Sequence, residues 1–252
     1  MNRRLLFVAA LCLTTGARWV TAAAMPDGSS SDEGQKLAEE IRSAAPAENS
    51  EITGTLILRA KGKKPEEIPV TCLVQIGAQD WKTVYQTGST AAHGAEKLVI
   101  VHRPEQPNQY FYARALRPGG ALPEPKGLDP AEADVPFAGS DFWLTDLGLE
   151  FLHWPEQIRL KGEMRLSQPC HVLDSRNPKG KEIVRVKSWI DKESNGILVA
   201  EAMNEKNSIV KEFNLHGSSF KKIKGRWQLE RMDIRSPRKD TQTTLKFNLP
   251  KD

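Results

Sequence analysis

Apolar residues recur at every second position over much of the chain, which is the spacing of strands. In the clearest case, Ile158, Leu160, Gly162, Met164 and Leu166 alternate with four charged residues. Successive side chains of a strand point to opposite faces of a sheet. This segment therefore predicts a strand with one buried face and one face in water.

The same period of two continues through most of the sequence. Strands are predicted, among others, at 52–58, 68–76, 81–87, 97–102, 109–116, 182–190, 197–204, 226–234 and 241–249. Asn195-Gly196 lies between two of them and is a strong hairpin turn signal. The count is about ten or eleven strands with no helix repeating between them, which favours one large antiparallel sheet over a parallel one. A sheet of that size must curl, split or close.

Three segments depart from the strand pattern. A short helix is predicted from Gln35 to about Ala45, with Leu37 and Ile41 on one narrow apolar stripe. Residues 117–136 hold five prolines and three glycines, which predicts a long loop. A second, more apolar helix is predicted after Ser140 or Asp141, either of which can cap it. Such a helix needs an apolar surface, and a concave face of the sheet would supply one.

The first 24 residues have the order of a secretory signal peptide. Arg3 and Arg4 precede an apolar run, and small residues follow as far as Ala24. The run is too short for a spanning helix of about 20 residues, although an uncleaved short anchor remains the alternative. The predicted organisation is a signal peptide at 1–24, a flexible leader at 25–34 and a single domain at 35–250. The protein is therefore expected in the periplasm.

Removal of residues 1–24 changes the charge balance. The chain has 36 basic and 32 acidic residues, and the segment takes away three arginines and no acid, which leaves a net charge of +1. We therefore expect no nucleic acid partner. Two local basic runs, at 221–226 and 235–239, are interpreted as solvated turns rather than a phosphate-binding patch. Removal of Cys12 leaves Cys72 and Cys170, which could form a disulfide or remain as buried thiols.

No catalytic or metal-binding motif is present in the sequence. The five histidines include no pair at the i,i+4 spacing of a helical zinc motif, and the nucleophile-elbow and phosphate-loop patterns are missing. Asp141 and Asp146 are interpreted as capping or solvated carboxylates rather than an acid–base pair. We expect no enzymatic activity, no catalytic residues, no cofactor and no metal, although a hydrolase whose proline-rich loop covers an unrecognised site remains a weaker alternative.

The order of these elements resembles the outer-membrane lipoprotein-sorting proteins of the LolA-like type. The residues that carry the resemblance are Gly139-Ser140-Asp141-Phe142, Asp146-Leu147, the strand at 158–166 and the segment 187–191. The resemblance implies a mainly β fold of the α+β kind, in which an incomplete antiparallel β-barrel has helices over its open concave side. It also implies a carrier that shields the acyl chains of lipoproteins, with inner- and outer-membrane transport components as partners. We expect a monomer.

A carrier of this kind needs an apolar concave wall. The candidate cavity residues are Leu56, Leu58, Val70, Val74, Phe142, Leu144, Leu147, Leu160, Met164, Trp189, Met203 and Phe213. For any one of them, a place in a filled core is the alternative. If the wall includes Met164, Met164→Glu should abolish binding of an apolar dye. The sequence does not single out an arginine latch, since Arg114, Arg159 and Arg185 are all available.

A second function on the same fold stays open. A periplasmic sensor or scaffold could bind an exposed segment of a membrane protein through a sheet edge. Such a protein should capture one membrane partner and bind no apolar dye.

Overall fold

A computed structural model describes residues 30–129, 132–215, 219–223 and 226–249. The predicted signal peptide and residues 25–29 of the predicted leader lie outside this part. Within it, no helix is long and apolar enough to cross a membrane.

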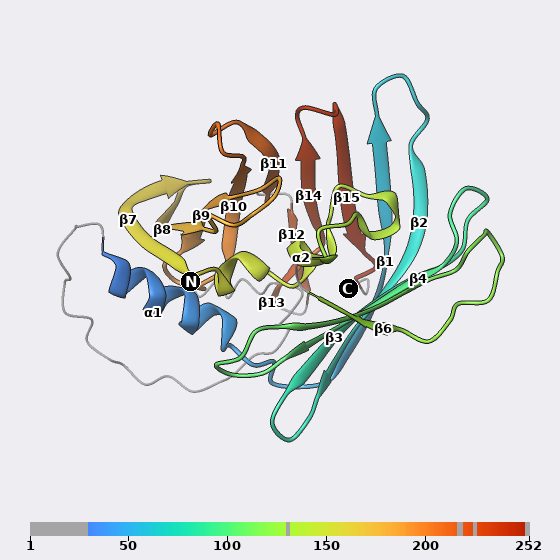
Figure 1. The fold of residues 1–252 in the computed structure, drawn as a ribbon, viewed down its shortest axis with the longest axis horizontal. Helices are drawn as coiled ribbons and strands as arrows, with labels where there is room; N and C mark the ends of the chain where they lie inside the picture. Colours follow the sequence, from blue (N-terminus) through green and yellow to red (C-terminus); the bar gives the residue numbers. More distant parts are fainter. Residues whose placement is uncertain (1–29, 130–131, 216–218, 224–225, 250–252) are drawn as a thin grey trace.

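Thirteen strands form one antiparallel sheet in the order β6-β5-β4-β3-β2-β1-β15-β14-β11-β10-β9-β8-β7. The bounds are β1 Ser50–Ala60, β2 Glu66–Ile76, β3 Trp81–Thr87, β4 Glu96–His102, β5 Gln109–Arg114, β6 Lys126–Leu128, β7 Glu156–Arg165, β8 Gln168–Arg176, β9 Arg185–Asp191, β10 Ile197–Met203, β11 Ile209–Asn214, β14 Arg231–Ser236 and β15 Thr241–Phe247. Strands β12 (Phe220–Ile223) and β13 (Arg226–Leu229) pair in a separate hairpin. The sheet ends at β6 and β7 without closing, so the predicted mainly β, incomplete barrel is confirmed (Figure 1).

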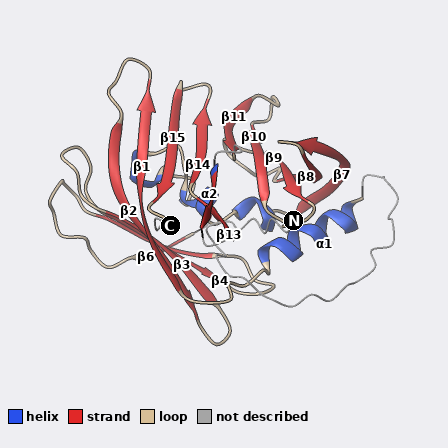
Figure 2. Cartoon of the chain, turned by 180° about the vertical axis from the view of Figure 1, so that it is seen from behind, coloured by secondary structure: helices blue, strands red, loops and turns tan. Residues whose placement is uncertain are grey.

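The helical elements lie across the middle of the molecule. They are α1 (Ser31–Arg42), the 3₁₀ turn η2 (Phe137–Gly139), the single-turn helix α2 (Leu144–Leu147) and the 3₁₀ turn η3 (Glu150–His153). Figure 2 shows β1–β4 and β6 on one side of α2 and β7–β11 on the other. The predicted continuous second helix is therefore wrong. Leu149 between α2 and η3 has a φ of 50°, a left-handed conformation that interrupts a helix.

Helix α1 begins four residues earlier than predicted, so residues 31–34 belong to the helix and not to the leader. The Ser30 hydroxyl accepts a hydrogen bond from the Glu33 amide (3.3 Å) and caps the helix. Gly34 allows α1 to lie directly on β7, because a Cβ there would be 2.3 Å from the Gln157 carbonyl oxygen. Leu37 and Ala38 are buried on α1. The apolar stripe in the sequence predicted this burial for Leu37.

Other sequence-based boundaries differ where turns intervene. The strand predicted at 182–190 begins at Arg185, because residues 177–184 form a loop that the Asn177 amide closes on the Val184 carbonyl (2.9 Å). The strand predicted at 226–234 is split at Glu230 into β13 and β14, which belong to different sheets. The proline-rich stretch contains β6, which pairs with β5 at the edge of the sheet, where strands tolerate nearby prolines.

Two apolar clusters fill the inner face of the sheet, and a third lies on its outer face. The largest joins β1–β5, β14 and β15 to residues 133–147. A second joins α1 and η3 to Leu173, Ile190 and Ile197. Val172 and Trp189 belong to the third. Because Val172 and Trp189 are the chain neighbours of Leu173 and Ile190, they point to the opposite face.

Cys72 and Cys170 are buried free thiols in this structure. Cys72 packs in the large inner cluster and Cys170 in the outer one. Burial raises the pKa of the Cys72 thiol to about 12. Of the two alternatives in the sequence analysis, buried thiols rather than a disulfide describe Cys72 and Cys170 in this structure.

Candidate functional site

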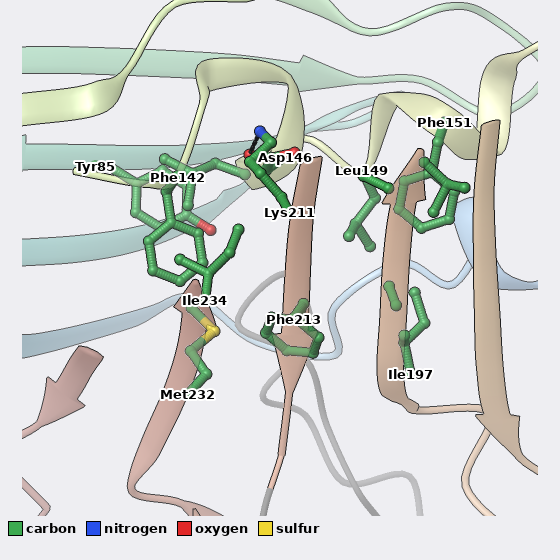
Figure 3. A pocket seen from close by; sticks show the side chains of 14 residues that line it. Tyr85, Phe142, Asp146, Leu149, Phe151, Ile197, Lys211, Phe213, Met232 and Ile234 are labelled. Atoms are coloured by element: carbon green, nitrogen blue, oxygen red, sulfur yellow. Dashed lines mark hydrogen bonds and ion pairs between the residues drawn. The ribbon is translucent and has the colours of Figure 1, made fainter. Parts of the chain in front are cut away.

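An apolar cavity of about 80 Å³ lies between α2 and the inner face of β9–β11 and β14. Its lining consists of Tyr85, Phe142, Asp146, Leu147, Leu149, Phe151, Val186, Ile197, Ala200, Ala202, Lys211, Phe213, Met232 and Ile234. Figure 3 shows Phe213, Met232 and Ile234 projecting from the sheet toward the same space as Phe142. Two of the fourteen lining residues carry charge, so the cavity suits an apolar ligand part.

Residues 137–153, here called the cover segment, close this cavity and are anchored at their N-terminal end. The Glu96 carboxylate accepts a hydrogen bond from the Ala138 amide (2.7 Å). The Asp141 carboxylate accepts hydrogen bonds from the hydroxyls of Thr241 (2.6 Å) and Thr243 (3.0 Å) on β15. Gly139 has a φ of +68°, and a Cβ there would lie 2.9 Å from the His93 ring. The Gly-Ser-Asp-Phe motif therefore fastens the segment to the sheet.

The C-terminal end of the cover segment is anchored by side chains of β5, β7 and the preceding turn. The side-chain amide of Asn108 donates a hydrogen bond to the Gly148 carbonyl (2.8 Å), and the Tyr110 hydroxyl donates one to the Glu150 carboxylate (2.8 Å). The Gln157 side chain donates to the Phe151 carbonyl (2.8 Å). Burial raises the pKa of Tyr110 well above its usual value, with the neighbouring Glu150 adding to the shift. Hydrogen bonds thus hold both ends of the segment.

The middle of the cover segment is held to the sheet by one ion pair. Lys211 of β11 pairs with Asp146 of α2, and its ammonium lies 3.6 Å from the centroid of the Trp143 ring. The Lys211 side chain is 3% exposed and that of Asp146 is 27% exposed. Burial lowers the pKa of Lys211, and Asp146 opposes that shift. The same carboxylate caps α2 by accepting from the Trp143 amide (2.7 Å), as the capping interpretation of Asp146 predicted.

A larger, more polar hollow of about 350 Å³ adjoins the cavity. The two share Asp146, Phe151, Val186 and Ala202. We call this hollow the vestibule; its other lining residues are Asp134, Trp143, Thr145, Glu150, Trp154, Asn177, Lys179, Gly180, Lys181 and Ile183. The apolar cavity therefore continues into a space that can take a polar group.

Seven of the twelve candidate cavity residues lie in the cover segment or on the inner face of the sheet beneath it. Phe142, Leu147 and Phe213 line the cavity. Leu56, Leu58, Val70 and Leu144 pack in the inner cluster behind it, which is the filled-core alternative. Val74 is buried, but it borders a separate hollow between β1, β2, β13 and β15.

The other four candidates do not line the cavity. Leu160 and Trp189 lie in the outer cluster, and Met164 is 64% exposed. The prediction for Leu160 and Trp189 is wrong, because their side chains point to the outer face of β7 and β9. Met164, which a register irregularity between Leu160 and Glu163 separates from Leu160, lies largely in water. In fact Arg159, next to Leu160, faces α1 and pairs with Glu33 (3.1 Å). Met203 is buried but is not among the cavity residues, since it follows Ala202 of the cavity wall and successive strand residues point to opposite faces.

Sequence reasoning missed Lys211, although a signal for it existed. Lys211 is two residues before Phe213, so a strand that points Phe213 inward also points Lys211 inward. The three arginines considered as latches are engaged elsewhere: Arg114 with Glu96, Arg159 with Glu33 and Arg185 with Asp174. The positions of the cavity-lining residues in 137–153 depend on the non-helical turn at Leu149, and the periodicity of the sequence could not predict that turn.

A buried polar network next to the cover segment is centred on His102. The ring nitrogens of His102 contact Asn108 (2.8 Å) and Thr83 (3.2 Å), and the ring stacks on Trp81. Burial lowers the pKa of His102 to about 4, against the hydrogen bond that the ring donates to the Asn108 side-chain oxygen, which favours the charged form. The folded protein therefore holds this histidine neutral at neutral pH.

His102 makes stability depend on pH in a defined window. Because the folded pKa is below the unfolded value of about 6.5, the unfolded chain binds more protons as pH falls below that value. The contribution is complete above pH 6.5 and is lost between pH 6.5 and 4. Lowering the pH from 7 to 5 should therefore reduce the unfolding free energy by about 2 kcal/mol through the protonation of His102 in the unfolded chain. Urea unfolding at both values should show a correspondingly smaller loss in His102→Gln; an equal loss in both proteins would contradict the assignment.

Among the described residues, no group of three or more His, Cys, Asp or Glu side chains is placed to hold a metal ion. Asp134, Asp146 and Glu150 lie at the vestibule, and the positive charges of Lys179, Lys181 and Lys211 balance their negative charge.

Comparisons with known proteins reveal the fold. A family model described as "Uncharacterized protein" matches residues 79–251. Similar solved structures include a putative outer membrane lipoprotein-sorting protein domain from Vibrio parahaemolyticus, with a TM-score of 0.68, 16% identity and coverage of 87% of this chain and 92% of that one. No curated protein matches the chain.

Two further solved structures extend the comparison. A DUF1329 family protein from Desulfovibrio piger has a TM-score of 0.67 and 17% identity, over 86% of this chain and 91% of that one. A LolA superfamily protein from Nitrosomonas europaea has a TM-score of 0.56 and 13% identity, over 87% and 94%. At these identities the similarity establishes the fold, which is LolA-like as the sequence resemblance predicted.

Proposed function

We propose that this chain is a periplasmic, non-enzymatic carrier for a lipid-bearing ligand. The chain belongs to the family whose model matches residues 79–251, and its fold is LolA-like. The observation that carries the proposal is the apolar cavity beneath α2, which continues into the polar vestibule. The ligand's acyl chain would occupy the cavity, and its polar part would remain in the vestibule. Lipoproteins are the ligand class that the similar sorting protein suggests.

The physical need for such a cavity follows from the ligand. Each CH₂ group of an acyl chain that leaves water for an apolar site gains about 0.8 kcal/mol, so a chain crosses an aqueous compartment favourably only inside a dry wall. The cavity, at about 80 Å³, is smaller than the ~150 Å³ that accommodates benzene in an engineered protein core. Binding therefore requires the cover segment or its side chains to move.

The anchoring of the cover segment indicates which part moves. Its two ends are fixed by the hydrogen bonds of Asp141 and Gly148, whereas α2 is held by the Lys211–Asp146 pair and by the packing of Leu144 and Leu147. We expect α2 to be displaced while the ends stay in place. The cavity would then enlarge without unfolding of the sheet.

Filling the cavity tests the carrier proposal. Ala200 lines the cavity from β10 opposite Phe213. Ala200→Leu adds three carbon atoms to the free space and should lower the affinity for an apolar dye at least about tenfold, since the ligand then competes with the protein's own side chain. Fluorescence titration measures this, and native mass spectrometry of wild-type protein from cells should reveal bound acyl mass.

Met164→Glu is the matched control, because Met164 is 64% exposed and is not among the residues that line the cavity. It should leave dye affinity unchanged, in contrast to the expectation from the sequence. Equal affinities of wild type and folded Ala200→Leu would place the dye elsewhere and remove the support for a carrier.

The sensor or scaffold on the same fold is favoured by one observation. Strand β7 is an edge strand of the sheet, and its outer edge is bridged at Arg159 by Ser30. The rest of an edge strand can pair with an added strand of another protein. Absence of acyl mass and of dye binding, together with capture of one membrane protein, would favour this function.

A further inference from the structure

The antiparallel order of the sheet gathers several turns at one end of the molecule. The β1–β2 and β14–β15 turns lie at this end, because β15 pairs with β1 and the Lys61 amide donates to the Asp240 carbonyl (3.4 Å). The β8–β9 and β10–β11 connections lie at the same end. Figure 1 shows the β1–β2 and β14–β15 turns side by side at the top of the view.

These two neighbouring turns, residues 61–64 and 237–240, are named here the basic rim. They contain Lys61, Lys63, Lys64, Arg238 and Lys239 against a single acid, Asp240. All five basic residues are exposed. The pair between Lys61 and Asp240 has side chains 85% and 69% exposed, so water weakens it and it neutralises little.

Three of the turns at the opposite end, residues 77–80, 103–108 and 191–196, contain four acids and two basic residues, and the β11–β14 connection at that end adds Lys221 and Lys222. The acids that follow the basic rim in the sequence are Glu66 and Glu67 at the start of β2. The basic rim is therefore a local cationic surface on a chain with almost balanced charge.

Two other features of the same end point toward a membrane surface. The vestibule reaches this end, since the β8–β9 connection supplies five of its lining residues between Asn177 and Ile183. Leu116, just after β5 and beside the β3–β4 connection, is fully exposed. Leu116 is followed by the exposed Arg117, and a large apolar side chain in water beside a cation suits the boundary between lipid headgroups and acyl chains.

We propose that the basic rim docks the protein on an anionic lipid bilayer, with the vestibule toward the membrane. Each lysine or arginine near an anionic leaflet adds to the attraction, and the effect decays within a Debye length. The docked orientation places the mouth of the cavity where an acylated ligand leaves or enters the bilayer. This property goes beyond a carrier role, which needs no direct contact with lipid, and it depends on different residues.

Cosedimentation with vesicles tests the docking surface. The purified protein should bind phosphatidylcholine vesicles containing phosphatidylglycerol, and should bind vesicles of phosphatidylcholine alone much more weakly. Raising the salt from about 0.1 M to about 1 M, which shortens the Debye length from about 10 Å to about 3 Å, should release it. The variant Lys63→Glu/Lys64→Glu/Lys239→Glu breaks no ion pair among the described residues and should weaken binding at least about tenfold.

A charge-matched variant at the other end is the control. Lys82→Glu/Lys161→Glu/Lys192→Glu changes three exposed lysines by the same charge and should reduce vesicle binding far less. Equal binding to neutral and anionic vesicles, or equal losses in the two triple variants, would overturn the proposal. Dye affinity should stay unchanged in both, so a failure of docking is distinguishable from a failure of the carrier function.

Discussion

Asp146→Ala is expected to lower the free energy of unfolding by about 3–5 kcal/mol, because it leaves the Lys211 ammonium buried without a counter-ion. The Lys211 side chain is only 3% exposed, so water cannot replace the lost carboxylate unless α2 moves. The substitution also removes the cap on the Trp143 amide, a smaller part of the loss. Urea unfolding followed by circular dichroism measures the change.

The reciprocal substitution should be much milder. Lys211→Met keeps an apolar chain in the cavity wall, while Asp146, at 27% exposure, keeps access to water and its hydrogen bond from Trp143. The double variant Asp146→Ala/Lys211→Met should recover most of the stability, since a buried pair can be replaced by apolar groups at little cost. If Asp146→Ala and the double variant are equally unstable, the cost does not come from an unpaired Lys211.

Trp189→Ala is expected to cost about 3–5 kcal/mol of unfolding free energy and to leave dye affinity unchanged. Trp189 is 1% exposed and packs in the outer cluster with Cys170, Val172 and Leu160. The guanidinium of Arg165 lies 4.2 Å from its ring centroid. Loss of this ring removes a large buried surface from the face opposite the cavity, so stability and ligand binding separate.

Trp189→Phe isolates the contribution of the ring. It retains most of the buried area but loses the hydrogen bond from the indole nitrogen to Glu163 (2.7 Å), so it should cost about 1–2 kcal/mol. Denaturant unfolding and dye titration of both variants provide the comparison. A drop in the dye affinity of folded Trp189→Ala would return Trp189 to the cavity wall, where the sequence analysis placed it.

Both experiments concern how charged and apolar groups are divided between the two faces of one sheet. On the inner face, a single ion pair fastens the cover segment over an otherwise apolar cavity. On the outer face, Trp189 is enclosed by Glu163, Arg165 and Lys187. The same alternation of strand residues therefore produces two apolar layers with different roles.

The pattern of the sequence was sufficient where one face of a strand is apolar and the other is polar. In β2, Ile68, Val70 and Cys72 are buried and alternate with Pro69 and Thr71, as predicted. In β7, Ile158 and Leu160 were recognised but assigned to the wrong face, because α1 covers the inner side and pairs Arg159 with Glu33 there. A register irregularity after Leu160 then separates Met164 from their face. Alternation defines two faces but does not identify the inner one.

By itself the sequence determined the strand-rich composition of the chain, the hairpin connections and the short N-terminal helix, since these follow from local periodicity and turn chemistry. Only the tertiary structure decided which faces enclose the cavity, how the Gly-Ser-Asp-Phe motif fastens the cover segment to β15, and that Lys211 meets Asp146 across 65 positions of the chain. These features depend on the curvature of the sheet and on contacts between distant segments, which no window of neighbouring residues contains.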